Sequence, residues 1–136
     1  MLKLTDSGEA AALATFVNKL PSQNLRLHLY KNNVAIKEST NVSELEEANF
    51  PGYASSLLTG SLWSVVAGSP SVAQYQSVSM VCSDGVSPQT IYGYYVTREG
   101  TGDLMWGEAF PTPQVILAPG NRIMVTPRLT ARDESD

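Results

Sequence analysis

Three tyrosines and a tryptophan fall within residues 89–110, "QTIYGYYVTREGTGDLMWGEAF", and these rings are the side chains best suited to hold a flat ligand. Rings spread over a sheet stack well on sugars or bases, so Tyr92, Tyr94 and Trp106 form a candidate aromatic surface. Alternatively, alternate strand positions fill the core or meet a neighbouring chain. Core or interface packing is favoured, because a ligand site needs convergent polar groups and none accompanies the rings.

The other reactive residue types do not form a catalytic or metal-binding pattern. His28 is the single histidine, and it alternates with leucines in a way that turns it towards solvent or a partner. Cys82 stands alone in an apolar run, which predicts a buried thiol. Glu44, Glu46 and Glu47 lack the interleaved Asp, Asn and Gly of a calcium loop. We therefore expect no enzymatic activity, no metal and no cofactor.

Composition restricts the function classes further. The chain has 136 residues, 43% hydrophobic and 16% charged, which predicts a single globular domain that needs no disulfide or metal. The net charge is −4 and the nine Lys and Arg residues are scattered, so we expect no nucleic-acid partner. We find neither a signal-peptide pattern nor an apolar run near the ~20 residues that span a bilayer. The sequence therefore predicts no membrane partner and synthesis in the cytoplasm.

One amphipathic helix is predicted over about residues 7–20. Asp6 precedes Glu9 by three residues, as in a capping box with Asp6 as the cap, and Pro21 ends the helix. Four apolar side chains at i, i+3, i+4 and i+7 predict the face that packs on the rest of the domain: Leu13, Phe16, Val17 and Leu20.

After Pro21 the apolar period changes to two, which indicates strands. In "NLRLHLY" the three leucines at 25, 27 and 29 face inward, and Arg26, His28 and Tyr30 face outward. "VAIKES" is expected to return as a second, shorter strand. "REGTGD" is a glycine-rich hairpin loop. About eight short strands at such spacing predict a mainly β fold: an antiparallel, jelly-roll-like sandwich with one N-terminal helix, spanning residues 7–131.

Strict alternation also predicts the faces of the two aromatic runs. In the first, Ile91, Gly93 and Tyr95 share one side of a strand, and Tyr92, Tyr94 and Val96 share the other. In the second, Leu104 and Trp106 oppose Met105 and Gly107.

Five segments together resemble a family of small virion-associated proteins of tailed bacteriophages. They are "LHLYKNN", "EEANFPGYA", "LW", "QTIYGYYVT…LMWGEAF" and "LAPGNRIMVTPRLT", in this order between Leu25 and Leu129. Similar small β-sandwich proteins in phage genomes are capsid decoration, or cement, proteins. The resemblance implies a homotrimer on the capsid exterior, with the major capsid protein as its partner and no catalytic residues. The alternative is a carbohydrate- or receptor-binding module of a tail or head fibre.

The two ends of the chain are expected to lie outside the sandwich. Residues 1–6 have no place in the strand pattern, so they are predicted to form an arm. Leu2 and Leu4 of this arm are expected to contact a neighbouring subunit or the shell by strand addition. Residues 132–136, "RDESD", form a charged tail that frays.

Overall fold

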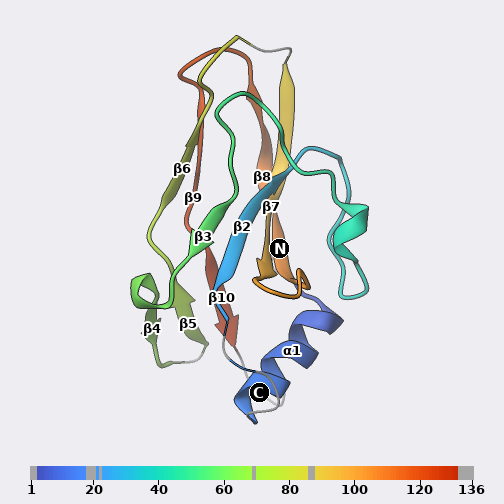
Figure 1. The fold of residues 1–136 in the computed structure, drawn as a ribbon, viewed down its shortest axis with the longest axis vertical. Helices are drawn as coiled ribbons and strands as arrows, with labels where there is room; N and C mark the ends of the chain where they lie inside the picture. The colour runs from blue at the N-terminus through green and yellow to red at the C-terminus, as the bar shows by residue number, and fades with distance from the viewer. Residues whose placement is uncertain (1–2, 18–20, 22, 69, 86–87, 132–136) are drawn as a thin grey trace.

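The fold is mainly β, with antiparallel sheets and one helix near the N-terminus, as predicted (Figure 1). The computed structural model describes residues 3–17, 21, 23–68, 70–85 and 88–131. None of the described helices is long and apolar enough to cross a membrane. The elements are β1 (Lys3–Leu4), α1 (Asp6–Phe16), β2 (Leu25–Tyr30), η1 (Val42–Glu44), β3 (Ser56–Leu58), η2 (Gly60–Leu62), β4 (Ser64–Val66), β5 (Ser71–Gln74), β6 (Val78–Val81), β7 (Gln89–Arg98), β8 (Leu104–Ile116), β9 (Arg122–Val125) and β10 (Arg128–Ala131).

Three sheets enclose a common apolar core. The five-stranded sheet has the order β1-β8-β7-β2-β3, the three-stranded sheet has the order β10-β5-β4, and β6 pairs with β9. Figure 1 shows the β6–β9 pair beside the long β7–β8 ladder, and β4, β5 and β10 at the same end as α1. The core between these sheets includes Leu27, Leu29, Ile91, Val96, Trp106, Ile116, Met80, Ile123 and Val125. The predicted inward face of β2 is therefore confirmed at Leu27 and Leu29.

Two segments each form two strands, because they pass from one sheet to the next. The run 71–83 forms β5 and β6, and the run 122–131 forms β9 and β10. The two segments pair with each other as β5–β10 and as β6–β9, with a break in the ladder between these pairs. At the break the Tyr75 amide donates to the Pro127 carbonyl at 2.9 Å. Pro127 has no amide hydrogen to continue the ladder. The two-stranded ribbon consequently bends in its middle.

The predicted strand "VAIKES" is instead part of a loop that covers the outer face of the five-stranded sheet. Ile36 and Leu45 from this loop bury themselves against Tyr30, Tyr95 and Leu104, forming a second apolar cluster. The edge of β2 that this strand would have used is paired with β3. The loop consequently covers the outward side of β2 at Tyr30, which is fully buried. The prediction that Tyr30 faces outward to solvent is therefore wrong.

Two register shifts in the β7–β8 ladder overturn the strict alternation predicted for its faces. Ile91 pairs with Gln114, but Gly93 pairs with Ala109, so β8 bulges between these pairs. β7 is also irregular here, because Tyr92 has no partner in the ladder, and Ile91 lies in the inner core with Tyr94 and Val96 rather than with Tyr95. The extra residues of β8 include Pro111 and Pro113, both exposed. Prolines are typical of an edge strand, because they cannot donate to a further strand.

The second shift makes Met105 an extra residue. Val96 pairs with Trp106 and Thr97 pairs with Leu104. As a result Met105 and Trp106 both contribute to the inner core, and Leu104 lies in the outer cluster. The predicted pairing of Leu104 and Trp106 on one face is wrong for this reason.

The helix begins one residue earlier than predicted, ends at Phe16 rather than near residue 20, and has a different N-terminal cap. The hydroxyl of Thr5, not the Asp6 carboxylate, accepts from the Gly8 amide at 3.0 Å. The same hydroxyl donates to the Leu104 carbonyl, and the Thr5 amide donates to the Met105 carbonyl at 3.0 Å. Thr5 is fully buried and therefore fixes the start of α1 to β8.

The side of α1 that packs on the domain carries its smallest residues. Gly8 and Ala11 are buried, and a Cβ atom at Gly8 would collide with the Met105 carbonyl group. The predicted packing face is wrong, because Leu13, Phe16 and Val17 are exposed. Leu20 lies outside the described residues. The large apolar side chains of the helix do share one face, but that face is exposed. The helix approaches β8 closely, so it packs through the side that has no large side chains.

The predicted arm is in part an edge strand of the chain's own sheet. Lys3 pairs with Gly107 and Leu4 with Trp106, and Leu4 packs against the inner core. Leu2 lies outside the described residues. Strand addition therefore takes place within one chain at residues 3–4.

Leu27 tests the inner core directly. We expect Leu27→Ala to lower the free energy of unfolding by about 2–5 kcal/mol, because its side chain is fully buried. Leu57→Ala on the adjacent strand is the matched control, with an expected loss of about 0.5 kcal/mol or less, because Leu57 is 40% exposed. Urea unfolding followed by circular dichroism measures both values. Equal losses would show that the assigned face of β2 is wrong.

Candidate interaction surface

The candidate aromatic surface is not a surface. Tyr94 and Trp106 are 3% and 2% exposed and belong to the inner core. Tyr92 is half-buried and packs against the outer cluster, on the other side of the sheet. The Tyr94 hydroxyl donates to Glu108 at 3.0 Å, which satisfies the polar end of a buried ring. The three rings therefore do not form a stacking platform, and the alternative of core packing holds for Tyr94 and Trp106.

His28 lies on the outer face of β2 but is not turned freely to solvent. Its side chain is 13% exposed, and its ring stacks on Tyr95 with centroids 4.6 Å apart. Nδ1 lies 2.8 Å from the Glu47 carboxylate, and Nε2 lies 2.8 Å from the Thr97 hydroxyl. Both ring nitrogens are engaged within the chain. This arrangement positions His28 as a structural link between β2, β7 and the covering loop.

The polar groups around His28 also bond to one another. The Tyr53 hydroxyl donates to Glu47 at 2.6 Å, and Arg26 forms an ion pair with Glu99 at 2.7 Å. The hydrogen bond between Arg26 and Glu99 raises the pKa of Arg26 and lowers the pKa of Glu99. Within the described part of the chain, no group of three His, Cys, Asp or Glu residues is placed to hold a metal ion. The partners of these polar side chains are thus neighbouring strands and loops.

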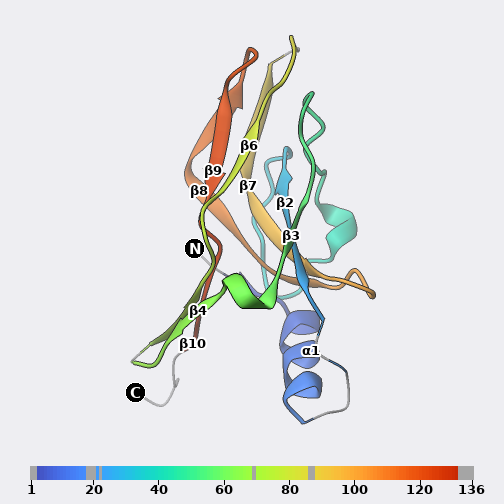
Figure 2. The same cartoon turned by 60° about the vertical axis from the view of Figure 1, so that its left-hand side comes forward.

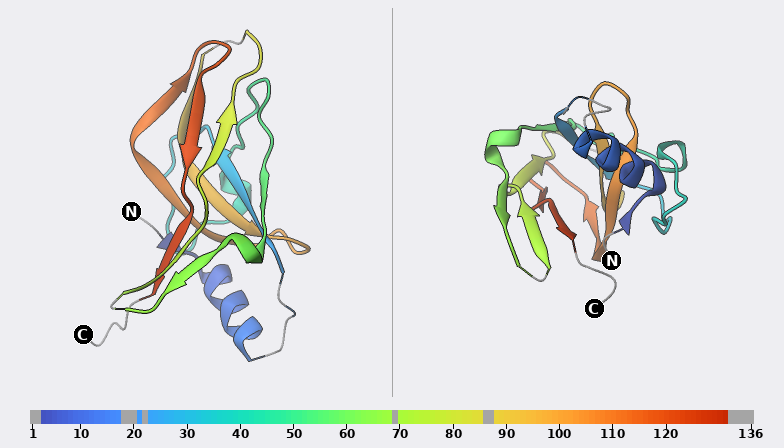
Figure 3. Two further views of the ribbon diagram at one scale, coloured as in Figure 1. Left: turned by 90° about the vertical axis from the view of Figure 1, so that its left-hand side faces the viewer. Right: turned by 90° about the horizontal axis from the view of Figure 1, so that it is seen from below.

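An apolar groove lies at the end of the molecule where α1 is found. It consists of three adjoining pockets, the first beside α1 and the other two against β5 and β10. At this end of the molecule β4, β5 and β10 diverge from the five-stranded sheet (Figures 2 and 3). The first pocket has a volume of about 370 Å³, the second about 240 Å³ and the third about 150 Å³. Leu25 and Met105 line the first two pockets, and Ala73 and Leu129 line the last two. Because neighbouring pockets share lining residues, we call the three together the apolar groove.

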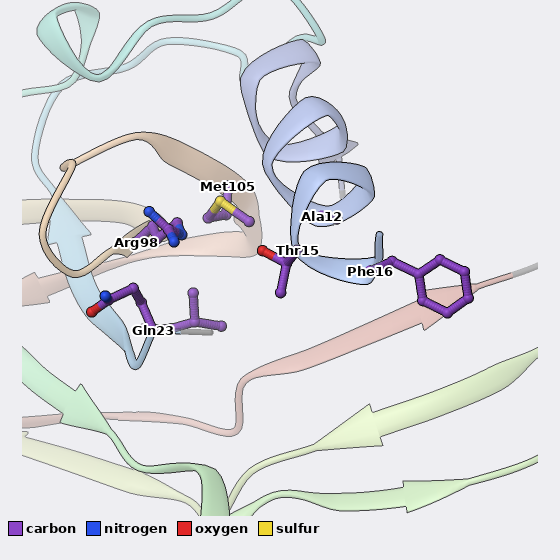
Figure 4. A pocket seen from close by; sticks show the side chains of 7 residues that line it. Ala12, Thr15, Phe16, Gln23, Arg98 and Met105 are labelled. Carbon is purple, nitrogen blue, oxygen red and sulfur yellow. The ribbon is translucent and has the colours of Figure 1, made fainter. Parts of the chain in front are cut away.

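The polar groups of the groove are concentrated in its first pocket. Figure 4 shows Arg98, Gln23 and Thr15 around this pocket. Arg98 is buried, and its Nη2 donates to the Pro21 carbonyl at 2.6 Å. The second pocket is lined by apolar residues alone: Leu25, Trp63, Ala73, Met105, Trp106 and Leu129.

Exposed apolar side chains border the groove on both sides. We call them the apolar rim: Leu13 and Phe16 of α1, Val17 at its end, and Val65 and Val66 of β4. Phe16 is 87% exposed, and Figure 4 shows its ring pointing away from the first pocket. β4 is an edge strand whose residues are all exposed. Large exposed apolar patches mark interaction sites on many folded proteins, so these side chains are candidates for such a site.

Sequence reasoning detected only part of this surface. The stripe on α1 was recognised, but it was assigned to packing within the domain. Trp63, Ala73 and Leu129 were missed, because they come from separate segments and no local spacing relates them. Comparison with known proteins finds no matching family model and no matching curated protein.

The tyrosines give a prediction for alkaline pH. Burial raises the pKa of Tyr30, Tyr94 and Tyr95, and burial together with Glu47 raises that of Tyr53. The unfolded value is about 10, so these groups stabilise the fold below that pH, and the stabilisation is lost as the pH rises and unfolded tyrosines ionise. We expect the free energy of unfolding to fall steeply above about pH 10. Tyrosinate absorbance of these four residues should appear together with the loss of circular dichroism, and ionisation within the intact fold would contradict this.

Proposed function

We propose that this protein is a structural component of a tailed-bacteriophage virion, a capsid decoration protein that binds the outer shell as a homotrimer. The observation that carries the proposal is the apolar groove with its apolar rim, a surface suited to assembly. The resemblance of five segments between Leu25 and Leu129 to small phage virion proteins supports the class of protein.

The physical demands on a decoration protein agree with this chain. Such a protein clamps neighbouring capsid subunits against a pressurised genome, which requires contact area and a rigid fold. A single domain of 14.7 kDa offers limited area per contact. Symmetric clustering multiplies weak contacts, because once one subunit docks, its partners bind at high effective concentration. A trimer on a local three-fold axis, bound to the major capsid protein, meets this demand.

The proposal assigns no catalytic activity to the protein. Its single histidine is held by Glu47 and Thr97 and stacks on Tyr95, so it serves the fold. The carbohydrate-binding alternative loses its main support, since Tyr94 and Trp106 are buried.

The copy number in purified virions tests the proposal. We expect quantitative mass spectrometry of virions from the phage that encodes the chain to find it in amounts comparable to the major capsid protein. Cryo-electron microscopy of the same particles should show its density on the capsid exterior. A few copies per particle would instead indicate a tail or fibre component, and complete absence from the virion would overturn the structural role.

A further inference from the structure

We infer that the edge strand β4 is a contact between two copies of this chain. β4 of one copy pairs antiparallel with β4 of a second copy across a two-fold axis, which joins the two three-stranded sheets into one continuous sheet. The inference needs only two copies, so it goes beyond the proposed trimer, and on a capsid the same contact joins subunits of neighbouring trimers. Two observations carry it: an unprotected strand edge and a long segment without charge.

β4 has one open edge and two uncovered faces. Its pairing partner among the described strands is β5, and each of its residues is exposed. Val65 and Val66 point to opposite faces of the sheet, yet they are 73% and 63% exposed. Figure 3 shows β4 at the outer border of the molecule. The main-chain N–H and C=O groups on its outer edge are therefore available to another strand.

Edge strands commonly carry a charge or a proline that prevents pairing with another chain, and β4 carries neither. Elsewhere in the chain, Lys3 lies on β1, Pro111 and Pro113 lie on β8, and Arg128 lies on β10. β4 consists of one serine and two valines, and valine has a high β propensity. β3 and β6 also lack charge, but each of them contains a buried residue. Of these strands, β4 is the one most open to strand addition.

The distribution of charge selects a second copy as the occupant. Residues 48–83, which include β3, β4, β5 and β6, contain no Asp, Glu, Lys, Arg or His, although the chain has 13 acidic and 9 basic residues. A charged partner is recognised through complementary charges, and this segment supplies none. A two-fold contact places residues near their own copies, so any charge on β4 would meet a like charge. Two chains of net charge −4 consequently repel least where this segment faces its copy.

Full overlap of the two β4 strands fixes their register. The two-fold axis then passes at Val65, so that Val65 faces its own copy and Ser64 faces Val66 of the second copy. Residues directly opposite each other in an antiparallel pair have Cα atoms about 4.5–5.5 Å apart. A disulfide spans Cα atoms roughly 4.4–6.8 Å apart. A cysteine at position 65 is therefore placed to form a disulfide with its copy.

Cross-linking of the full-length Val65→Cys variant tests the contact. Under oxidation by air with copper phenanthroline, we expect a covalent dimer at a yield about tenfold or more above that of Leu117→Cys, because pairing holds the two thiols at a high effective concentration. Leu117 is the matched control, since it is exposed and apolar but follows β8, outside residues 48–83. The wild-type chain should give no covalent dimer, because Cys82 is buried. Non-reducing gel electrophoresis measures the yields.

A second substitution separates strand pairing from random collision. Val66→Lys in the Val65→Cys chain places two lysines beside the axis and should lower the yield to that of Leu117→Cys. Val66→Thr keeps a branched, uncharged side chain and should preserve the yield. Circular dichroism checks that each variant is folded, which is expected because every residue of β4 is exposed.

Three outcomes in folded chains would overturn the inference: equal yields from Val65→Cys and Leu117→Cys, a Val66→Lys substitution without effect, or a thiol at position 65 that in virions cross-links to the capsid protein and not to its copy. A chain that is abundant in virions but gives no dimer would overturn the contact and leave the decoration role intact. A chain that gives the dimer but is absent from virions would support the contact and overturn that role.

Discussion

The extra residue Met105 in β8 is the constraint on which the rest of the structure depends. Because β7 has no residue to match it, Leu104 and Trp106 are directed to opposite sides of the sheet. The sheet is thereby able to fill an inner core and an outer cluster at the same level. The Met105 carbonyl also accepts from Thr5, so the irregularity provides the point where the helix is attached.

The groove follows from a second irregularity on the opposite side of the core. The ribbon formed by β5–β6 and β9–β10 is continuous in pairing but bends near Pro127. Its upper half closes the inner core, while its lower half diverges from the five-stranded sheet. α1 lies at the same end of the molecule as this lower half and packs on β8 through Gly8 and Ala11. Apolar side chains between the five-stranded sheet and the lower half of the ribbon are left uncovered and line the second pocket.

Local sequence patterns were sufficient where neighbours along the chain determine the structure. A period of two identified the buried face of β2 at Leu27 and Leu29, and the glycines of "REGTGD" take the positive φ angles of a hairpin loop at Gly100 and Gly102. Patterns failed where a partner distant in sequence decides. The side taken by Ile91 depends on how β7 meets the shifted register of β8 at Tyr92 and Gly93, and the exposure of Phe16 depends on what β8 leaves room for. Periodicity identifies an apolar face, but it does not identify the surface that covers that face.

The missing side chain at Gly8 has a consequence for where the exposed apolar face of α1 lies. Contact with the Met105 carbonyl at this position sets the angle between the helix and the sheet. Phe16 lies about 12 Å further along the helix axis, at 1.5 Å per residue, so a small change of this angle displaces its ring considerably. The position of the Phe16 ring relative to the five-stranded sheet is therefore set at a buried glycine. Substitutions at Gly8 would displace the exposed apolar face of α1 without changing any residue of that face.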